Sequence, residues 1–292
     1  MSDKNRDVTQ DVTNESLNAI VTALSPMKGD RILSICGTGD VPFAFLTEGG
    51  MVDAVDIDGL MISEARRRLS QIQEGDYRGF LGVKSPWAIE ESNQRSDFFS
   101  PGVKYTFAPP EGGAKLAAYH YFCQFRDALR ADGTYLRMLD IPLFGPNFQK
   151  VEPYVNFDFS NARRLNRLRE NSGGITFYEG NILDFLGKRR YSRAWLSNII
   201  GYKEQEFDFA ARILSALSTS LISGGLFYST LGNRTGEFID RMCAEGIIPE
   251  GTFKLNPQRT KLAARIQADA LQRIERAGGS TYTWNPRVYQ KV

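Results

Sequence analysis

The sequence predicts a three-layer α/β fold, in which a mostly parallel sheet is flanked by helices. Segments with helical periodicity separate its short apolar runs, and parallel strands need such helical crossovers. A turn with two glycines follows the first run. We therefore expect residues 1–292 to form a single domain around this sheet, with residues 1–14 flexible. The apolar runs typical of buried strands lie at residues 32–36, 52–56, 175–178, 193–199 and 226–232.

The first strand, its turn and the second strand lie between Arg31 and Asp58. Before them we expect a helix that is capped by Asn14 or Ser16, runs through Leu24 and ends near Pro26. Gly37 and Gly39 have no Cβ, so the backbone can turn tightly there and approach a ligand. Asp56 ends the second run, 17 positions after Gly39. A carboxylate at that place can accept two hydrogen bonds from a ribose diol. The pattern predicts a Rossmann-like nucleotide-binding unit whose ligand contains an adenosine-type ribose.

The residues after the second glycine indicate which nucleoside binds. A dinucleotide fingerprint needs a third glycine, but Gly39 is followed by Asp40, Val41 and Pro42. An acid at the mouth of the turn repels a pyrophosphate and suits the ammonium and sulfonium of S-adenosylmethionine. We therefore expect S-adenosylmethionine rather than NAD or FAD. The alternative is a glycine turn that binds no ligand.

The stretch RILSICGTGD resembles the first motif of the class I S-adenosylmethionine-dependent methyltransferases. It departs from that motif because Ser34 stands where the family usually has an acid, and because the glycine expected between Ile35 and Cys36 is missing. With AVDID, SEARRRLSQI and DYRGFLGV after it, LSICGTGDVPFAFL is more similar to the branch that transfers the 3-amino-3-carboxypropyl arm, as in betaine-lipid synthesis. The resemblance covers residues 15–85 and, more weakly, 175–235.

This resemblance implies where the cofactor and the acceptor bind. In the family the end of the third strand touches the adenine, and here an amide, Asn181, can both accept and donate hydrogen bonds. Ser197 and Asn198 fall at the end of the fourth strand, where the reactive arm meets the acceptor; the alternative is that they only form a turn. Tyr154 and Tyr202 offer faces for a cation–π contact with the sulfonium. The residues expected to bind the cofactor are Cys36, Gly37, Thr38, Gly39, Asp40, Asp56, Ile57, Asn181, Ile182 and Ser197, and those expected to act in catalysis are Ser197, Asn198, Tyr202 and Tyr154.

Residues 76–157 interrupt the alternation and are expected to form an insertion or cap. A loop with several prolines comes first, then a helix near 113–131, then an aromatic-rich stretch that either lines an apolar pocket or is plain core. Arg66, Arg67 and Arg68 are expected to form a solvated helix face. The remaining predictions are helices at 62–72, 162–170, 206–222, 237–244 and 258–277, a strand near 252–255, and a last edge strand in 282–292 that Pro286 weakens.

The composition argues against several other classes of protein. A net charge of +2, from 36 Lys and Arg against 34 Asp and Glu, gives no field that favours nucleic acid. Three scattered cysteines, Cys36, Cys123 and Cys243, indicate a reducing cytoplasm, and the polar start resembles neither a signal nor a transit peptide. No run approaches the ~18 apolar residues of a membrane span. The single histidine, His120, lies in an apolar segment, and no ligand spacing predicts a metal site.

Two reactions follow from these expectations. In the first, a nucleophile attacks the γ-carbon of the methionine arm and methylthioadenosine leaves. The nucleophile is a small molecule, or the arm's own amine, which closes to azetidine-2-carboxylate. In the second, a small acceptor attacks the methyl group and S-adenosylhomocysteine leaves. In-line positioning supplies most of the rate in both, potentially ~7–11 kcal/mol. The first is the leading expectation, and a non-catalytic nucleoside-binding protein is the third alternative.

Overall fold

The computed structural model describes residues 16–37, 39–75, 162–197, 199–200, 207–230, 233–276 and 285–292. The predicted insertion at 76–157 and the predicted flexible segment at 1–14 lie outside the described residues. The prediction of a single domain over the whole chain therefore stays a prediction.

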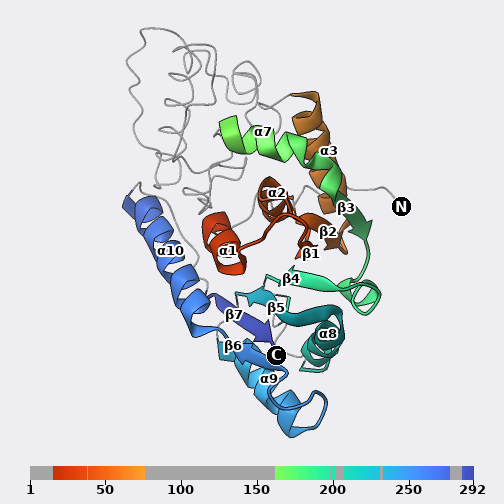
Figure 1. Ribbon diagram of the computed structural model, residues 1–292, viewed down its shortest axis with the longest axis vertical. Helices are drawn as coiled ribbons and strands as arrows, with labels where there is room; N and C mark the ends of the chain where they lie inside the picture. The colour runs from red at the N-terminus through yellow and green to blue at the C-terminus, as the bar shows by residue number, and fades with distance from the viewer. Residues whose placement is uncertain are drawn as a thin grey trace, which may run out of the picture.

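A seven-stranded sheet lies at the centre of the described structure, in the order β3-β2-β1-β4-β5-β7-β6 (Figure 1). Strands β1 to β5 run parallel to one another, whereas β7 is antiparallel to both of its neighbours, β5 and β6. The predicted three-layer, mostly parallel α/β fold is therefore confirmed. The strands are β1 (Arg31–Ile35), β2 (Met51–Asp56), β3 (Ile175–Glu179), β4 (Tyr191–Trp195), β5 (Leu221–Ser229), β6 (Phe253–Leu255) and β7 (Arg287–Lys291).

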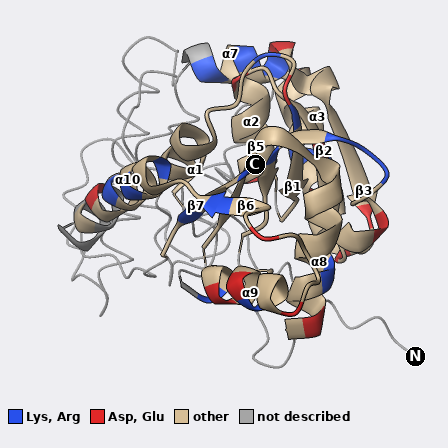
Figure 2. Cartoon of the chain, turned by 60° about the horizontal axis from the view of Figure 1, so that its bottom comes forward, with Lys and Arg blue, Asp and Glu red and all other residues tan. Residues whose placement is uncertain are grey.

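Helices cover both faces of the sheet. Two short 3-10 turns, η3 (Ser172–Gly174) and η4 (Ile182–Asp184), flank β3. Figure 2 shows charged residues, in blue and red, on the outer helices α7, α9 and α10. The α-helices are α1 (Leu17–Leu24), α2 (Asp40–Thr47), α3 (Gly59–Glu74), α7 (Ala162–Glu170), α8 (Phe207–Ser220), α9 (Asn233–Ala244) and α10 (Pro257–Arg276).

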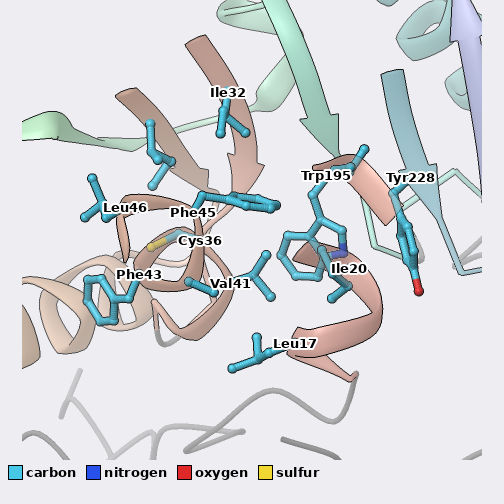
Figure 3. Packing of buried hydrophobic residues seen from close by; sticks show 14 of the residues in the cluster. Leu17, Ile20, Ile32, Cys36, Val41, Phe43, Phe45, Leu46, Trp195 and Tyr228 are labelled. Atoms are coloured by element: carbon cyan, nitrogen blue, oxygen red, sulfur yellow. The ribbon is translucent and has the colours of Figure 1, made fainter. Parts of the chain in front are cut away.

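Two hydrophobic cores lie on the two faces. Successive strand residues point to opposite faces, so Ile32 enters the core beneath α1, α2, α3, α7 and α10, and Leu33 enters the core beneath α8 and α9. In the first core, Ile20 of α1, Val41 of α2 and Trp195 of β4 lie close together (Figure 3). The helix α2 is buried along its whole length. The glycine turn that precedes it is therefore anchored in a packed core.

The structure corrects two of the predicted strands. The fourth ends at Trp195 instead of residue 199, because the chain turns after Leu196, whose carbonyl accepts from the Ile199 N–H. The C-terminal strand is not at the edge: β7 lies between β5 and β6, and the edge falls to the three-residue β6. Pro286 precedes β7 and removes none of its ladder hydrogen bonds.

Two arginines fasten the C-terminal end of α1. The Arg193 guanidinium donates to the Leu24 carbonyl at 2.7 Å, and that of Arg259 donates to the Ala23 carbonyl at 2.6 Å. These carbonyls have no partner within the helix, so charged donors satisfy groups that otherwise need water. The short helix is thereby tied to β4 and to α10.

A buried carboxylate ties three segments together toward the amino ends of the strands. Asp53 of β2 is 3% exposed and pairs with Arg31 at 3.0 Å and with Arg189 at 2.8 Å. Burying an ionised carboxylate is costly unless charged donors compensate it. Asp53 therefore links β1, β2 and the segment before β4.

Asp53→Asn is expected to lower the free energy of unfolding by about 1.5–3 kcal/mol, because both arginines lose their charged acceptor. Urea unfolding measures this change. Glu245→Gln, in the exposed pair with Arg241, is the control and is expected to stay within about 0.5 kcal/mol of the natural protein. Equal stability of Asp53→Asn and the natural protein would contradict the linking role.

Candidate cofactor-binding site

The turn after β1 depends on its two glycines. Gly37 has φ 49° and Gly39 has φ 94°, both in the left-handed region that favours glycine. The Gly39 N–H donates to the Cys36 carbonyl at 2.9 Å, which closes the turn at the start of α2. A Cβ on Gly39 would come within 2.5 and 2.6 Å of two Phe43 ring carbons. The sequence places glycine where backbone and packing require it.

Backbone donors hold the side chain of Asp56 at the end of β2. The Gly37 N–H donates to Oδ2 at 2.8 Å and the Asp58 N–H donates to Oδ1 at 3.0 Å. An ionised carboxylate has about four acceptor positions, so capacity remains for hydroxyl donors such as those of a ribose. Burial raises the pKa of Asp56, while the backbone hydrogen bonds from Asp58 and Gly37 oppose that shift. The half-buried carboxylate is thus already oriented by the turn.

Ile57 lies next to this carboxylate and is 77% exposed. It stands between Asp56 and Asp58, whose side chain accepts from the Leu60 N–H at 2.9 Å and caps α3. The cap fixes the path of the chain past Ile57. An exposed apolar side chain beside the Asp56 carboxylate offers a surface on which a nucleoside base can lie.

Asn181 follows β3 and lies beside the same edge. The Gly180 N–H donates to the backbone carbonyl of Asp56 at 2.8 Å, which brings the ends of β2 and β3 together. The Asn181 side chain accepts from the Leu183 N–H at 3.0 Å, so one acceptor position is used locally while its amide donors remain. Ile182 is 3% exposed and packs into the core beneath α8. Its side chain therefore serves the core.

Asp40 has a partner that the sequence did not predict. The carboxylate is 1% exposed and lies 2.8 Å from a guanidinium nitrogen of Arg68, itself 4% exposed. The prediction that Arg66, Arg67 and Arg68 share a solvated face is wrong for Arg68. Its spacing from Ala65 and Ile72, three and four residues away, places it on the buried side of α3 and would have revealed this.

Cys36 lies beneath the turn. It is 2% exposed, and burial, with the nearby charges of Asp56 and Asp40, raises the pKa of its thiol. A neutral buried thiol is a poor nucleophile. Cys36 can shape the floor of a cofactor site and is unsuited to attack on the cofactor.

Ser197 lies two residues after the end of β4. Its φ of 50° is unusual for a residue with a Cβ, and its carbonyl accepts from the Thr230 N–H at 3.1 Å. Strained backbone of this kind clusters at functional sites. Thr38 of the turn and three expected catalytic residues, Asn198, Tyr202 and Tyr154, lie outside the described residues.

These features meet where the strand order reverses. The chain passes from β1 to β2 on one side and later to β4 on the other, so the ends of β1 and β4 flank a topological switch point. Ligands of open α/β sheets bind in the crevice at such points. Backbone and side-chain hydrogen bonds bring together Gly37, Asp56 and the Gly180–Asn181 segment, and Ser197 follows the adjoining strand β4 by two residues. The arrangement is suited to a nucleoside.

Within the described ranges, no group of three or more metal-type side chains (His, Cys, Asp or Glu) comes together. In the same ranges, no helix has both the length and the apolar character needed to cross a membrane.

No protein-family model and no curated protein matches this sequence. Solved structures are similar at low identity. A TehB-like S-adenosylmethionine-dependent methyltransferase from Corynebacterium glutamicum is 10% identical, with 95% of this chain and 88% of that chain covered and a TM-score of 0.40. An S-adenosylmethionine-dependent O-methyltransferase from Thermotoga maritima is 11% identical, with 97% and 67% covered and a TM-score of 0.44. A Streptococcus mutans protein solved with S-adenosylhomocysteine is 9% identical, with 96% and 100% covered and a TM-score of 0.41.

Because these likenesses are distant, the sheet itself carries the fold assignment. The order β3-β2-β1-β4-β5-β7-β6, with an antiparallel β7 between β5 and β6 and helices on both faces, defines a Rossmann-like three-layer α/β fold. The assignment of the chain to the aminocarboxypropyl-transferring branch stays a prediction.

Gly37→Ala is expected to cost about 1–2 kcal/mol of unfolding free energy, the usual penalty for a Cβ in a left-handed conformation. Gly39→Ala is expected to cost a further 1–3 kcal/mol or so, because the Phe43 ring must also move. Gly37 is the matched control, since a Cβ there meets no atom within 4 Å. Urea unfolding compares the two variants, and equal losses would contradict the proposed packing of Phe43 against the turn.

Proposed function

We propose that this protein binds S-adenosylmethionine and transfers one of its alkyl groups to a small-molecule acceptor. The observation that carries the proposal is the Asp56 carboxylate, preset by the N–H groups of Gly37 and Asp58 beside the glycine turn. Its remaining acceptor positions suit a ribose diol, and the exposed Ile57 beside it suits an adenine face. The near-neutral composition favours a small-molecule acceptor over nucleic acid.

Methyl transfer is the first candidate reaction. The acceptor's lone pair attacks the methyl carbon, the carbon–sulfur bond breaks, and its electrons return to sulfur to give S-adenosylhomocysteine. The leaving thioether is neutral, so the protein's main task is to hold donor and acceptor in line. The strand order, with an antiparallel β7 between β5 and β6, resembles that of the class I methyltransferases and supports this candidate. We place Ser197 at the meeting point of the reactive arm and the acceptor, with Asn198, Tyr202 and Tyr154 as further catalytic candidates from the sequence.

Transfer of the 3-amino-3-carboxypropyl arm is the second candidate, and the altered first motif favours it. Ser34, at the position where the family usually has an acid, is fully buried, and its hydroxyl donates to the Ile35 carbonyl at 2.9 Å. A neutral group there offers the methionine arm a different electrostatic environment from a carboxylate. In this reaction a nucleophile attacks the γ-carbon and methylthioadenosine leaves. When the arm's own amine attacks, the second product is azetidine-2-carboxylate.

Incubation with S-adenosylmethionine, alone and with a cell extract, separates these candidates when products are identified by mass spectrometry. S-adenosylhomocysteine is the expected product. Methylthioadenosine would instead establish attack on the arm, and its formation without extract would indicate cyclisation or lysis. Tight binding without either product would contradict both reactions and leave a nucleoside-binding protein.

Asp56→Asn is expected to lower the rate at subsaturating S-adenosylmethionine about tenfold or more, the usual effect of losing a charged acceptor. Asp269→Asn, an exposed acid on α10, is the control and is expected to keep the full rate. Full activity of Asp56→Asn would remove this residue from the cofactor site.

A further inference from the structure

The ion pair of Asp40 and Arg68 is a buried charged contact between α2 and α3. The two side chains are 1% and 4% exposed, and a guanidinium nitrogen lies 2.8 Å from Oδ1 of Asp40. Desolvating two charges costs several kcal/mol per ion before their attraction offsets it. Burying an apolar pair of similar volume would cost less free energy. We therefore look for a role of this contact besides stability.

The pair sits directly against the glycine turn. Asp40 is the first residue of α2, and Gly39 before it has no side-chain cap for that helix. The Arg68 guanidinium lies over the Phe43 ring, with 5.6 Å from its central carbon to the ring centre. The same ring packs against Gly39, where an added Cβ would meet it at 2.5 Å. Arg68 thus contacts two α2 residues that adjoin or touch Gly39.

The α3 helix touches the turn at a second point. An added Cβ on Gly39 would lie 3.2 Å from Cβ of Ala65, one turn of helix before Arg68. Phe43 is fully buried and points away from Val41 and the Trp195 side of α2 (Figure 3). Gly39 is therefore enclosed between Phe43 of α2 and Ala65 of α3.

The position of this turn sets the geometry of the ribose-binding acid. The Gly39 N–H is bonded to the Cys36 carbonyl, and the next residue, Gly37, donates to Oδ2 of Asp56 at 2.8 Å. A shift at Gly39 is therefore transmitted through a closed turn to the Asp56 carboxylate. Small displacements of positioning groups have large effects on binding and rate.

We propose that Arg68 is a positioning residue for the cofactor-binding turn, acting through Asp40 and Phe43 to hold Gly37 against Asp56. This proposal rests on the proposed function, because it assumes that the turn and Asp56 bind the nucleoside of S-adenosylmethionine. Arg68 acts from behind the turn and does not itself contact the ligand. The buried pair also neutralises Asp40, so that carboxylate's attraction for the cofactor's cationic arm is weaker than its position in the sequence suggests.

The test is a calorimetric titration of the full chain with S-adenosylhomocysteine, beside urea unfolding of the same variants. Arg68→Met, which removes the charge and keeps the length, is expected to weaken affinity about tenfold or more, as contacting residues couple strongly. Arg68→Lys, which keeps the charge, is expected to recover part of that loss. Asp53→Asn is the matched control, because it breaks another buried carboxylate–arginine contact away from the turn, and it is expected to lower stability with unchanged affinity.

A double variant, Asp40→Asn with Arg68→Met, separates positioning from stability and remains usable if the single Arg68 variant does not fold. It leaves no unpaired buried charge, so its stability is expected to exceed that of Arg68→Met. Its affinity is expected to stay low, since the contact between α3 and the turn is still missing. Affinity that recovers with stability would overturn the proposal.

Two further outcomes distinguish a failure of the Arg68 proposal from a failure of the proposed function. If Asp40→Asn weakens binding while Arg68→Met does not, Asp40 acts on the ligand directly and the positioning role of Arg68 is wrong. If the natural protein itself does not bind S-adenosylhomocysteine, the proposed function fails, and the positioning proposal fails with it.

Discussion

The hydrogen bond from the Gly37 N–H to the Asp56 carboxylate joins the turn after β1 to the end of β2. It needs a left-handed turn, a strand that ends on an acid, and a close approach of the two chain segments. The Cys36 N–H, bonded to the Val55 carbonyl at 2.8 Å, extends the parallel ladder up to this point. The proposed cofactor site is thus a continuation of the sheet.

The rest of the molecule holds this junction in place. The wholly buried α2 anchors the far side of the turn. From α3, Ala65 lies against Gly39 and Arg68 pairs with Asp40. Charged groups at buried positions hold the outer connections: Asp53 joins β1 and β2 to the segment before β4, and two arginines hold the end of α1. Both sets of contacts join elements that are distant in the sequence.

Much of the fold and of the candidate site could be predicted from local patterns in the sequence. The glycine turn, the acid that ends β2 and the strand–helix alternation depend on neighbouring residues, and the structure confirms them. The contacts of Asp40 could not be predicted from its own surroundings, because its partner is on another helix 28 positions along the chain. The position of β7 inside the sheet depends on long-range pairing with β5 and β6, and a single strand pattern carries no information on its neighbours. The spacing of Arg68 from the apolar Ala65 and Ile72 does indicate the buried side of α3, in contrast to the predicted solvated face.

The most direct measurement compares S-adenosylhomocysteine with its 2′,3′-dideoxy analogue by calorimetry, using the natural protein and Asp56→Asn. If the carboxylate accepts from the ribose diol, removal of the hydroxyls lowers affinity for the natural protein about tenfold or more, and makes little difference to the variant. Equal affinity of the natural protein for both ligands would contradict the assignment of Asp56, and with it the cofactor site built around the Gly37 hydrogen bond.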